Sequence, residues 1–293
     1  MIFDSLQQSG ATSSGGDTGG SSGGGLITQN TLVTVGAGGD YPTINAALEY
    51  LSQFSPVFKS SGIKAEVRLL AGFVMAEQVM LRGVDLGWIS ITGADNETSI
   101  DRSALLQSVE ARWPAFCGIE NAVLPAIGQL FLMSSSGESD YRDGIYLTGS
   151  SRSLVLPGCG IKAAGSIGAN VNAGSFLTAI GSDFQNAGYA GILAERGSVV
   201  SASGSNVSGN GFYGLRAIGG SRVDAHSLSA TGSLGYGIGS QSGALVNADS
   251  GNFTGARNKG IEVWRGGFVS AYGATGTLSQ VANTPAGHGL ILQ

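Results

Sequence analysis

Four segments of the sequence share one pattern: GILAERGSVVSA (191–202), GLRAIGGSRVDA (214–225), GIGSQSGALVNA (237–248) and GIEVWRGGFVSA (260–271). Each begins with glycine and an aliphatic residue, and each ends in valine, one variable residue and alanine. The first glycines of successive segments are 23 residues apart. A fixed period of this length indicates an architecture in which each repeat stacks on the next.

The repeat extends beyond these four segments. The pairing of glycine with a small aliphatic residue begins at Gly144, continues at Gly168 and returns at Gly289. We therefore expect regular repeats over residues 144–293. A β-propeller is the competing repeat fold, but its blades need about 40–50 residues each, roughly twice the period found in this sequence.

Strand residues alternate between two faces, so the repeat predicts which side chains point inward. Four positions of the unit hold apolar residues in almost every copy. These inward columns are Ile145, Ala169, Ile192, Leu215, Ile238 and Ile261; Leu177, Val200, Val223, Val246 and Val269; Ala179, Ala202, Ala225, Ala248 and Ala271; and Phe184, Val207, Ala230 and Phe253. The predicted fold is all-β: a right-handed parallel β-helix with coils of about 23 residues and three strands per coil.

One helix is expected ahead of the strands. Ile44, Ala47, Leu48 and Leu51 recur at helical spacing, and Thr43 stands where an N-cap residue is needed. An open end of a β-helix exposes core side chains and unpaired backbone groups. We expect this amphipathic helix to cap that end of the stack.

The remaining segments divide the chain further. Residues 1–30 combine a short apolar start with a Gly/Ser linker, which lacks the apolar residues needed for a core. Residues 31–95 contain the helix and the first strands, and residues 96–143 are predicted to form irregular coils and loops. The first ten residues show neither the basic nor the apolar region of a signal peptide, so none is expected.

The composition excludes several classes of protein. The net charge is -5 with no basic stripe, which argues against nucleic-acid binding. No apolar run approaches the length of about 18 residues that indicates a membrane span. Cys117 and Cys159 form no metal-binding pattern and are expected to be buried without a disulfide. The glycine-rich run at 36–40 lacks the lysine of a phosphate loop, so no cofactor and no metal are expected.

Three further segments carry a family resemblance: VTVGAGGDYPTINAALEYL (33–51), AEVRLLAGFVMAEQVMLRG (65–83) and WISITGAD (88–95). Their order resembles the opening module of the pectate-lyase-like β-helix superfamily, particularly bacteriophage tailspike and tail-fibre proteins. The acid, arginine and glutamine sets of pectin-degrading members are not found. The resemblance therefore implies a receptor-binding or structural fibre rather than a pectinase.

The same resemblance implies partners and a location. Phage spikes of this kind attach to the virion through a short N-terminal segment and reach the host with a trimeric β-helix. We accordingly expect a homotrimer on the virion surface, joined to other virion proteins through residues 1–30, with Ile2, Phe3 and Leu6 as apolar anchors. The expected external partner is a host cell-surface polysaccharide.

Candidate glycan-binding residues are those of the outward columns, where aromatic rings can stack on sugars and polar groups can bond hydroxyls. They are Tyr189, Glu195, Phe212, Tyr213, Arg216, Tyr236 and Trp264. The alternative is that these rings cover the neighbouring coil or another subunit.

Catalytic candidates are few. Ser203, His226 and Asp249 occupy one column on successive coils, in the order of a nucleophilic triad, although polar ladders are common in this fold. Glu195 and Glu262 lie three coils apart, about 14 Å, which exceeds the separation of glycosidase carboxylates. Asp140 and Asp143 stand in a polar loop, where solvation explains them.

Three hypotheses follow for the function. The leading one is a phage fibre or spike that binds a host glycan without cleaving it. The alternatives are a polysaccharide depolymerase, acting as hydrolase or lyase, and a structural protein that decorates or links the capsid or tail.

Overall fold

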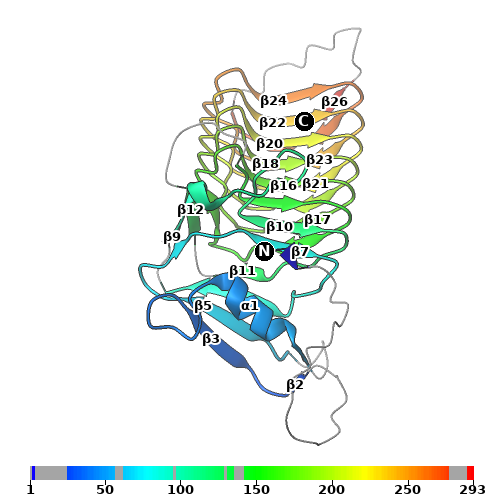
Figure 1. Cartoon of the computed structure of the whole chain (residues 1–293). Coiled ribbons are helices and arrows are strands. Elements are labelled where there is room, and N and C mark those ends of the chain that lie inside the picture. Colours follow the sequence, from blue (N-terminus) through cyan, green and yellow to red (C-terminus); the bar gives the residue numbers. More distant parts are fainter. Residues whose placement is uncertain are drawn as a thin grey trace, which may run out of the picture.

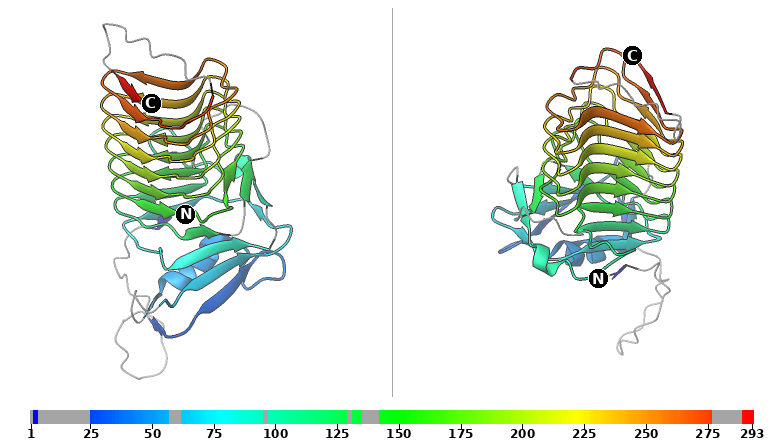
Figure 2. Two further views of the ribbon diagram at one scale, coloured as in Figure 1. Left: turned by 180° about the vertical axis from the view of Figure 1, so that it is seen from behind. Right: turned by 90° about the horizontal axis from the view of Figure 1, so that it is seen from above.

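The computed structural model describes residues 2–3, 25–56, 62–94, 97–128, 131–134, 142–276 and 289–293. The chain forms a stack of parallel coils, with the helix α1 (Ile44–Ser52) at the end nearer the N-terminal strands (Figures 1 and 2). The stack is a parallel β-solenoid, which confirms the predicted fold class.

One side of the stack is a sheet of nine strands within the described residues, all paired in parallel. Ile192 pairs with Leu215 and Leu215 with Ile238, which confirms the 23-residue period. The strands are β1 (Ile2–Phe3), β7 (Val79–Arg82), β10 (Phe116–Ile119), β13 (Ile145–Leu147), β16 (Ile167–Val171), β18 (Ala190–Ala194), β20 (Tyr213–Ile218), β22 (Tyr236–Gln241) and β24 (Lys259–Trp264).

A second side is a sheet of seven parallel strands in the described part of the chain. Each strand is three residues long, and its middle residue points into the core. The strands are β14 (Arg152–Leu154), β17 (Phe176–Thr178), β19 (Val199–Ser201), β21 (Arg222–Asp224), β23 (Leu245–Asn247), β25 (Phe268–Ser270) and β26 (Leu290–Leu292).

The N-terminal part adds three smaller parallel sheets. One contains β3 (Thr31–Val35), β5 (Ala65–Leu69), β8 (Ile89–Gly93) and β11 (Ala126–Gly128). Another contains β6 (Val74–Met75), β9 (Glu97–Ile100), β12 (Phe131–Ser134) and β15 (Gly160–Lys162), and the last pairs β2 (Gly25–Ile27) with β4 (Phe54–Pro56).

The third side of the later coils is shorter than the predicted strand. After Gly160 of β15 it consists of single bridging residues, and these are Asp183, Asn206, Ser229, Asn252 and Thr275. The chain turns close to each bridge; near Asn206, for example, Gly204 and Gly209 have φ values of 66° and 68°. Turns on both sides leave room for one extended residue.

The predicted inward columns form the core. Every residue of the four columns is at most 4% exposed, and together they build one continuous cluster with the helix residues Ile44, Ala47, Leu48 and Leu51. Each Å² of apolar surface removed from water contributes about 25 cal/mol to the free energy of folding, so this cluster is the main source of stability.

The repeated glycine has a steric cause. A Cβ atom at Gly214 would lie 2.6 Å from the carbonyl oxygen of Gly237 in the next coil and 2.6 Å from the Cβ of Ala230. A Cβ atom at Gly168 or at Gly237 would likewise lie 2.6 Å from the carbonyl oxygen of the equivalent glycine in the following coil. Only a residue without a side chain fits this close approach of two backbones.

The helix begins as predicted. The Thr43 side chain accepts a hydrogen bond from the backbone N–H of Ala46 at 3.1 Å. The carboxylate of Glu77 accepts the N–H groups of Ile44 (2.6 Å) and Asn45 (2.9 Å), and burial raises the pKa of this carboxyl. These contacts satisfy donors that are unpaired in the first turn of a helix, and they fix α1 on the first coils.

Residues 101–115 leave the regular stack between β9 and β10. Val109 and Arg112 form an antiparallel bridge, and Val109 packs on the outer surface of the nine-stranded sheet. It covers Met80, Cys117, Ile119 and Tyr146 there. The irregular segment is thus folded back on the sheet.

The prediction for Gly289 is wrong. Leu290, which follows it, pairs with Phe268 in the seven-stranded sheet rather than with Ile261 in the nine-stranded one. Residues 290–292 therefore form the next strand of the seven-stranded sheet after β25. Gly289 is thus not equivalent to Gly260, which lies in a strand of the nine-stranded sheet.

The N-terminal anchors are only partly described. The backbone of Ile2 and Phe3 pairs in parallel with Met80 and Leu81 at the edge of the nine-stranded sheet. Leu6 and most of the linker lie outside the described residues. Their role in attachment stays a prediction.

Replacing Gly214 by alanine is expected to destabilise the stack by about 1–3 kcal/mol, because the new methyl group collides with Gly237 and Ala230. Urea unfolding followed by circular dichroism measures the change. Leu234→Ala, at a side chain that is 58% exposed, is the control and should change the free energy of unfolding by about 0.5 kcal/mol or less. Equal stability of both variants would contradict the close-approach argument.

Candidate functional site

Aromatic rings gather on the outer surface of the nine-stranded sheet. Tyr213 and Tyr236 are paired in adjacent strands, and their rings stack with centroids 5.3 Å apart. Tyr189 and Phe212 stack nearly parallel at 6.0 Å, and Phe212 meets Tyr213 edge-on at 4.8 Å. Four of the predicted glycan-binding residues are thus brought together in one cluster, with their rings packed against one another.

Charged groups complete this cluster. Arg216 donates a hydrogen bond to the hydroxyl of Tyr189, and its guanidinium lies 4.8 Å from the centroid of the Tyr213 ring. The Tyr213 hydroxyl donates to Glu262 at 2.8 Å. Burial, together with this bond to Glu262, raises the pKa of Tyr213. Glu262 therefore belongs to the cluster as the acceptor for Tyr213, a role that its position in the repeat does not reveal.

The cluster differs from the prediction in its accessibility. Tyr213 is only 4% exposed, because Phe212, Tyr236 and Arg216 pack against it, so it offers little surface to a ligand. Tyr189 and Tyr236 are half-buried, and Phe212 is 39% exposed. The polar groups of the cluster bond mainly to one another.

Glu195 and Trp264 do not join this cluster. Glu195 follows β18 and is half-buried, whereas Tyr189 precedes the same strand. Trp264 ends β24, is 37% exposed and lies under the guanidinium of Arg265 at 4.4 Å. The predicted glycan-binding residues therefore fall into two groups: the aromatic cluster lies where the strands begin, and Glu195 and Trp264 lie where the strands end.

The column of Ser203, His226 and Asp249 has no triad geometry. The Ser203 hydroxyl donates to Asp224 at 2.9 Å instead of to His226. Asp249 accepts the hydroxyl of Ser270 (2.7 Å) and the N–H of Tyr272 (2.9 Å). A triad requires serine and aspartate on the same imidazole, so this column is a polar ladder.

A carboxylate that the sequence analysis did not select lies on the nine-stranded sheet. Glu110, at the tip of the folded-back segment with φ 50°, accepts hydrogen bonds from Tyr146 (2.8 Å), Thr148 (3.4 Å) and Asn172 (3.5 Å). Its Oε2 is 3.7 Å from a guanidinium nitrogen of Arg196. No repeat pattern points to this residue, because it belongs to the irregular segment.

The interpretation of Asp143 as a solvated loop residue is wrong. Asp143 is 2% exposed and accepts the N–H of Ile167 (3.1 Å) and the amide of Asn170 (3.3 Å). Arg112 lies 3.7 Å from the same carboxylate. Asp143 therefore ties neighbouring coils together, while Asp140 and His288 lie outside the described residues.

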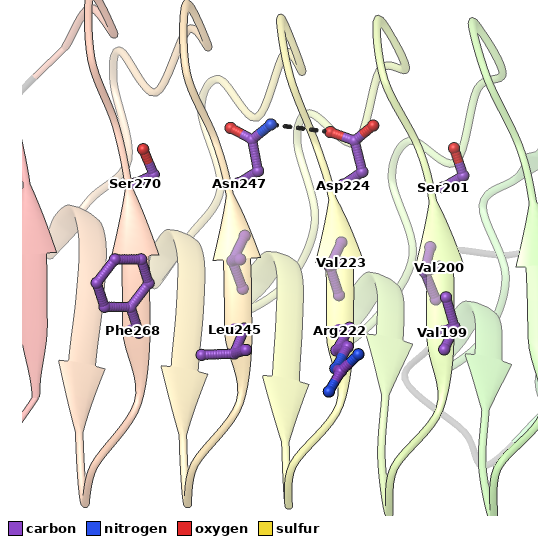
Figure 3. Close-up of a pocket in the computed structure, with 11 residues that line it drawn as sticks. Val199, Val200, Ser201, Arg222, Val223, Asp224, Leu245, Asn247, Phe268 and Ser270 are labelled. Carbon is purple, nitrogen blue, oxygen red and sulfur yellow. Dashed lines mark hydrogen bonds between the residues drawn. The ribbon is translucent and has the colours of Figure 1, made fainter.

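The outer face of the seven-stranded sheet carries a shallow groove of about 430 Å³ (Figure 3). Two parallel columns line it. One is mainly apolar and holds Val199, Arg222, Leu245 and Phe268; the other is polar and holds Ser201, Asp224, Asn247 and Ser270. A further depression of about 420 Å³ on the same face is lined by Arg152, Leu154, Phe176 and Thr178, among others. The two lie on consecutive coils of one sheet.

Alternation within the sequence repeat is sufficient to predict the two outward columns of this groove, although none of their residues is among the candidates named above. The inward Val223 lies between Arg222 and Asp224, so alternation directs both neighbours outward. The same reasoning applies to Phe176 and Thr178 around Leu177. Phe176 is 40% exposed and Leu245 is 45% exposed, which makes this an accessible apolar column.

Other kinds of site find less support in the described part of the chain. There, no three histidine, cysteine or acidic side chains stand close enough to hold a metal ion. Cys117 and Cys159 are buried and form no disulfide, as predicted. None of the helices in the described ranges is long and apolar enough to cross a bilayer.

The raised pKa of Tyr213 predicts how the stability of the protein changes at alkaline pH. Its folded-state pKa lies above the ordinary value of about 10, so its stabilising contribution is complete below pH 10 and is lost as pH rises through the raised pKa. Tyr213→Phe should cost about 1 kcal/mol at pH 8. Above pH 10 the gap in Tm between wild type and variant should shrink. Tyr272→Phe, at an exposed ring, is the control, and a gap that widens with pH would contradict the assignment.

Comparison with known proteins agrees with the architecture. The family model described as "right handed beta helix region" matches residues 132–275, which contain the coils from β13 to β25. No curated protein matches the sequence. The chain therefore carries a right-handed β-helix region over these coils.

Proposed function

We propose that this chain is a fibre or spike protein that binds a cell-surface polysaccharide along the outer face of its seven-stranded sheet. The observation that carries the proposal is the groove of Figure 3, in which an accessible apolar column runs beside a polar one. Sugars present apolar C–H faces and hydroxyl edges, which match these two columns. The columns repeat at about 4.8 Å per coil, which suits an extended polymer.

The groove is favoured over the aromatic cluster of the nine-stranded sheet. In that cluster the Tyr189 and Phe212 rings face each other, and the Tyr213 hydroxyl is bonded to Glu262. A ligand there would have to displace contacts within the protein. In the groove, Phe268 and Leu245 present their side chains to the outside without a covering segment in the described residues.

The biological setting is proposed from the family resemblance. The opening module over residues 31–95 resembles that of phage tailspikes and tail fibres, which supports a location on a virion. By the same resemblance the protein is a homotrimer, and residues 1–30 attach it to other virion proteins.

A depolymerase is a second candidate, and one observation favours it. Glu110 bonds to Asn172, and Glu195 occupies the position after Ala194 in the adjacent strand, next to Asn172. Asn172 and Glu195 thus lie one strand spacing, about 4.8 Å, apart, and Glu110 and Glu195 are the candidate pair of carboxylates for glycoside hydrolysis. This pair lies on the nine-stranded sheet, away from the groove.

The test measures binding and chain length together, with a panel of purified bacterial surface polysaccharides. Binding with unchanged polymer length supports the adhesin. Shortening that Glu110→Gln or Glu195→Gln abolishes would instead establish the depolymerase. The absence of both effects would leave a structural virion component and overturn the glycan-binding proposal.

Two phenylalanines with matched exposure locate the binding face. Phe176→Ala, in the depression that continues the apolar column of the groove, should weaken polysaccharide binding about threefold to tenfold, because an aromatic platform is lost. Phe212→Ala, on the nine-stranded sheet, should leave the dissociation constant unchanged. Biolayer interferometry with immobilised polysaccharide measures both. The reverse pattern would move the binding site to the aromatic cluster.

A further inference from the structure

We infer that the polysaccharide bound in the groove is anionic, and that Arg152 and Arg222 are the residues that select its negative groups. This inference rests on the proposed function and adds the chemical class of the ligand. It starts from the one position in the apolar column of Figure 3 where a charge replaces an aliphatic or aromatic side chain.

Arg222 lies between apolar neighbours. It pairs in register with Val199 on one side and Leu245 on the other, and its side chain is exposed. Within the described residues no ion pair joins it to a carboxylate. Its guanidinium thus stands in the groove with its donors available.

Arg152 repeats this arrangement three strands away. It occupies the same column, next to Phe176, and its guanidinium lies 5.1 Å from the centroid of that ring. Three strand spacings put the two arginines about 14 Å apart along the groove. Contact with the ring face orients the guanidinium without neutralising its charge.

Five basic residues elsewhere in the described chain form ion pairs with acids. Such pairs are Arg68–Glu66, Arg82–Glu120, Arg112–Asp143, Lys162–Asp183 and Arg196–Glu110. Arg152 and Arg222, in one column of the seven-stranded sheet, have no such ion pair in the described residues and keep their charge available to a ligand.

The carboxylates beside the groove are already bonded. Asp224 accepts the Ser203 hydroxyl (2.9 Å) and the Asn247 amide (3.2 Å), the latter drawn in Figure 3. Asp249 accepts from Ser270. Asp224 lines the polar column of the groove and is held there by these bonds, whereas Arg222 in the apolar column has no ion-pair partner in the described chain.

The loss of water around Arg222 on binding favours a ligand with a negative charge. A polymer lying over Val199 and Leu245 removes water from Arg222, and a charge that loses water without gaining a partner is costly. A ligand carboxylate, sulfate or phosphate restores that interaction, and it does so with the two-pronged geometry that guanidinium favours. A neutral glycan offers only hydroxyls.

The experiment compares each native polysaccharide of the panel with its carboxyl-reduced form, which keeps the linkages but removes carboxylate charge; sulfated and phosphorylated polymers are compared with their desulfated or dephosphorylated forms. The native acidic form should bind at least tenfold more tightly, and its affinity should fall as salt rises from 0.05 to 0.5 M. Arg222→Gln and Arg152→Gln should each remove most of that difference. Arg257→Gln, the same change at an exposed turn outside the groove, is the control and should leave binding unchanged.

Asp224→Asn adds a test of sign. It removes a negative charge two residues from Arg222, so it should strengthen binding of the acidic form. Equal binding of native and neutralised polymers, or unchanged binding by the arginine variants, would overturn this inference while the proposed function stands. If no polysaccharide binds, the proposed function fails and the inference fails with it.

Discussion

The direct stacking of each coil on the next is the constraint on which the rest of the structure depends. Parallel strands are about 4.8 Å apart, so equivalent residues of neighbouring coils are in contact. Gly214 shows how little room remains, since its α-carbon faces the carbonyl oxygen of Gly237. The same closeness allows one backbone bond to recur at each level, as from Ala202 to Asp224 and from Ala225 to Asn247, both at 2.7 Å. A coil of different length would break this register.

A fixed register divides the side chains into two classes with different freedom. Inward positions pack against the same positions of the neighbouring coils, and the column from Leu177 to Val269 is accordingly aliphatic throughout. Outward positions one residue away carry no such requirement. Phe176 and Arg222 occupy the same outward column on different coils. Binding chemistry can therefore change along the groove while the fold stays the same.

The sequence was sufficient for features that depend on local spacing. The inward columns, the 23-residue period and the helix with Thr43 as N-cap are all confirmed. It was insufficient for features that depend on contacts between neighbouring side chains of one face, or with the irregular segment. Tyr213 stands at an outward position but is buried by neighbours from the same face, and Glu110 reaches Tyr146 only through the course of an irregular segment. Alternation predicts the direction of a side chain, and it does not predict what covers it.

The outer faces of the two large sheets differ in how many of their side chains are already engaged in contacts within the protein. On the nine-stranded sheet, Glu110 is bonded to Tyr146, Asp143 to Asn170, and Glu262 to Tyr213. These polar groups already hold a loop or a neighbouring coil, so a ligand there competes with the protein's own contacts. On the seven-stranded sheet the apolar column is accessible and its arginines have no acid partner in the described chain. Because a ligand there displaces only water, this face is the one on which binding is least opposed by folding.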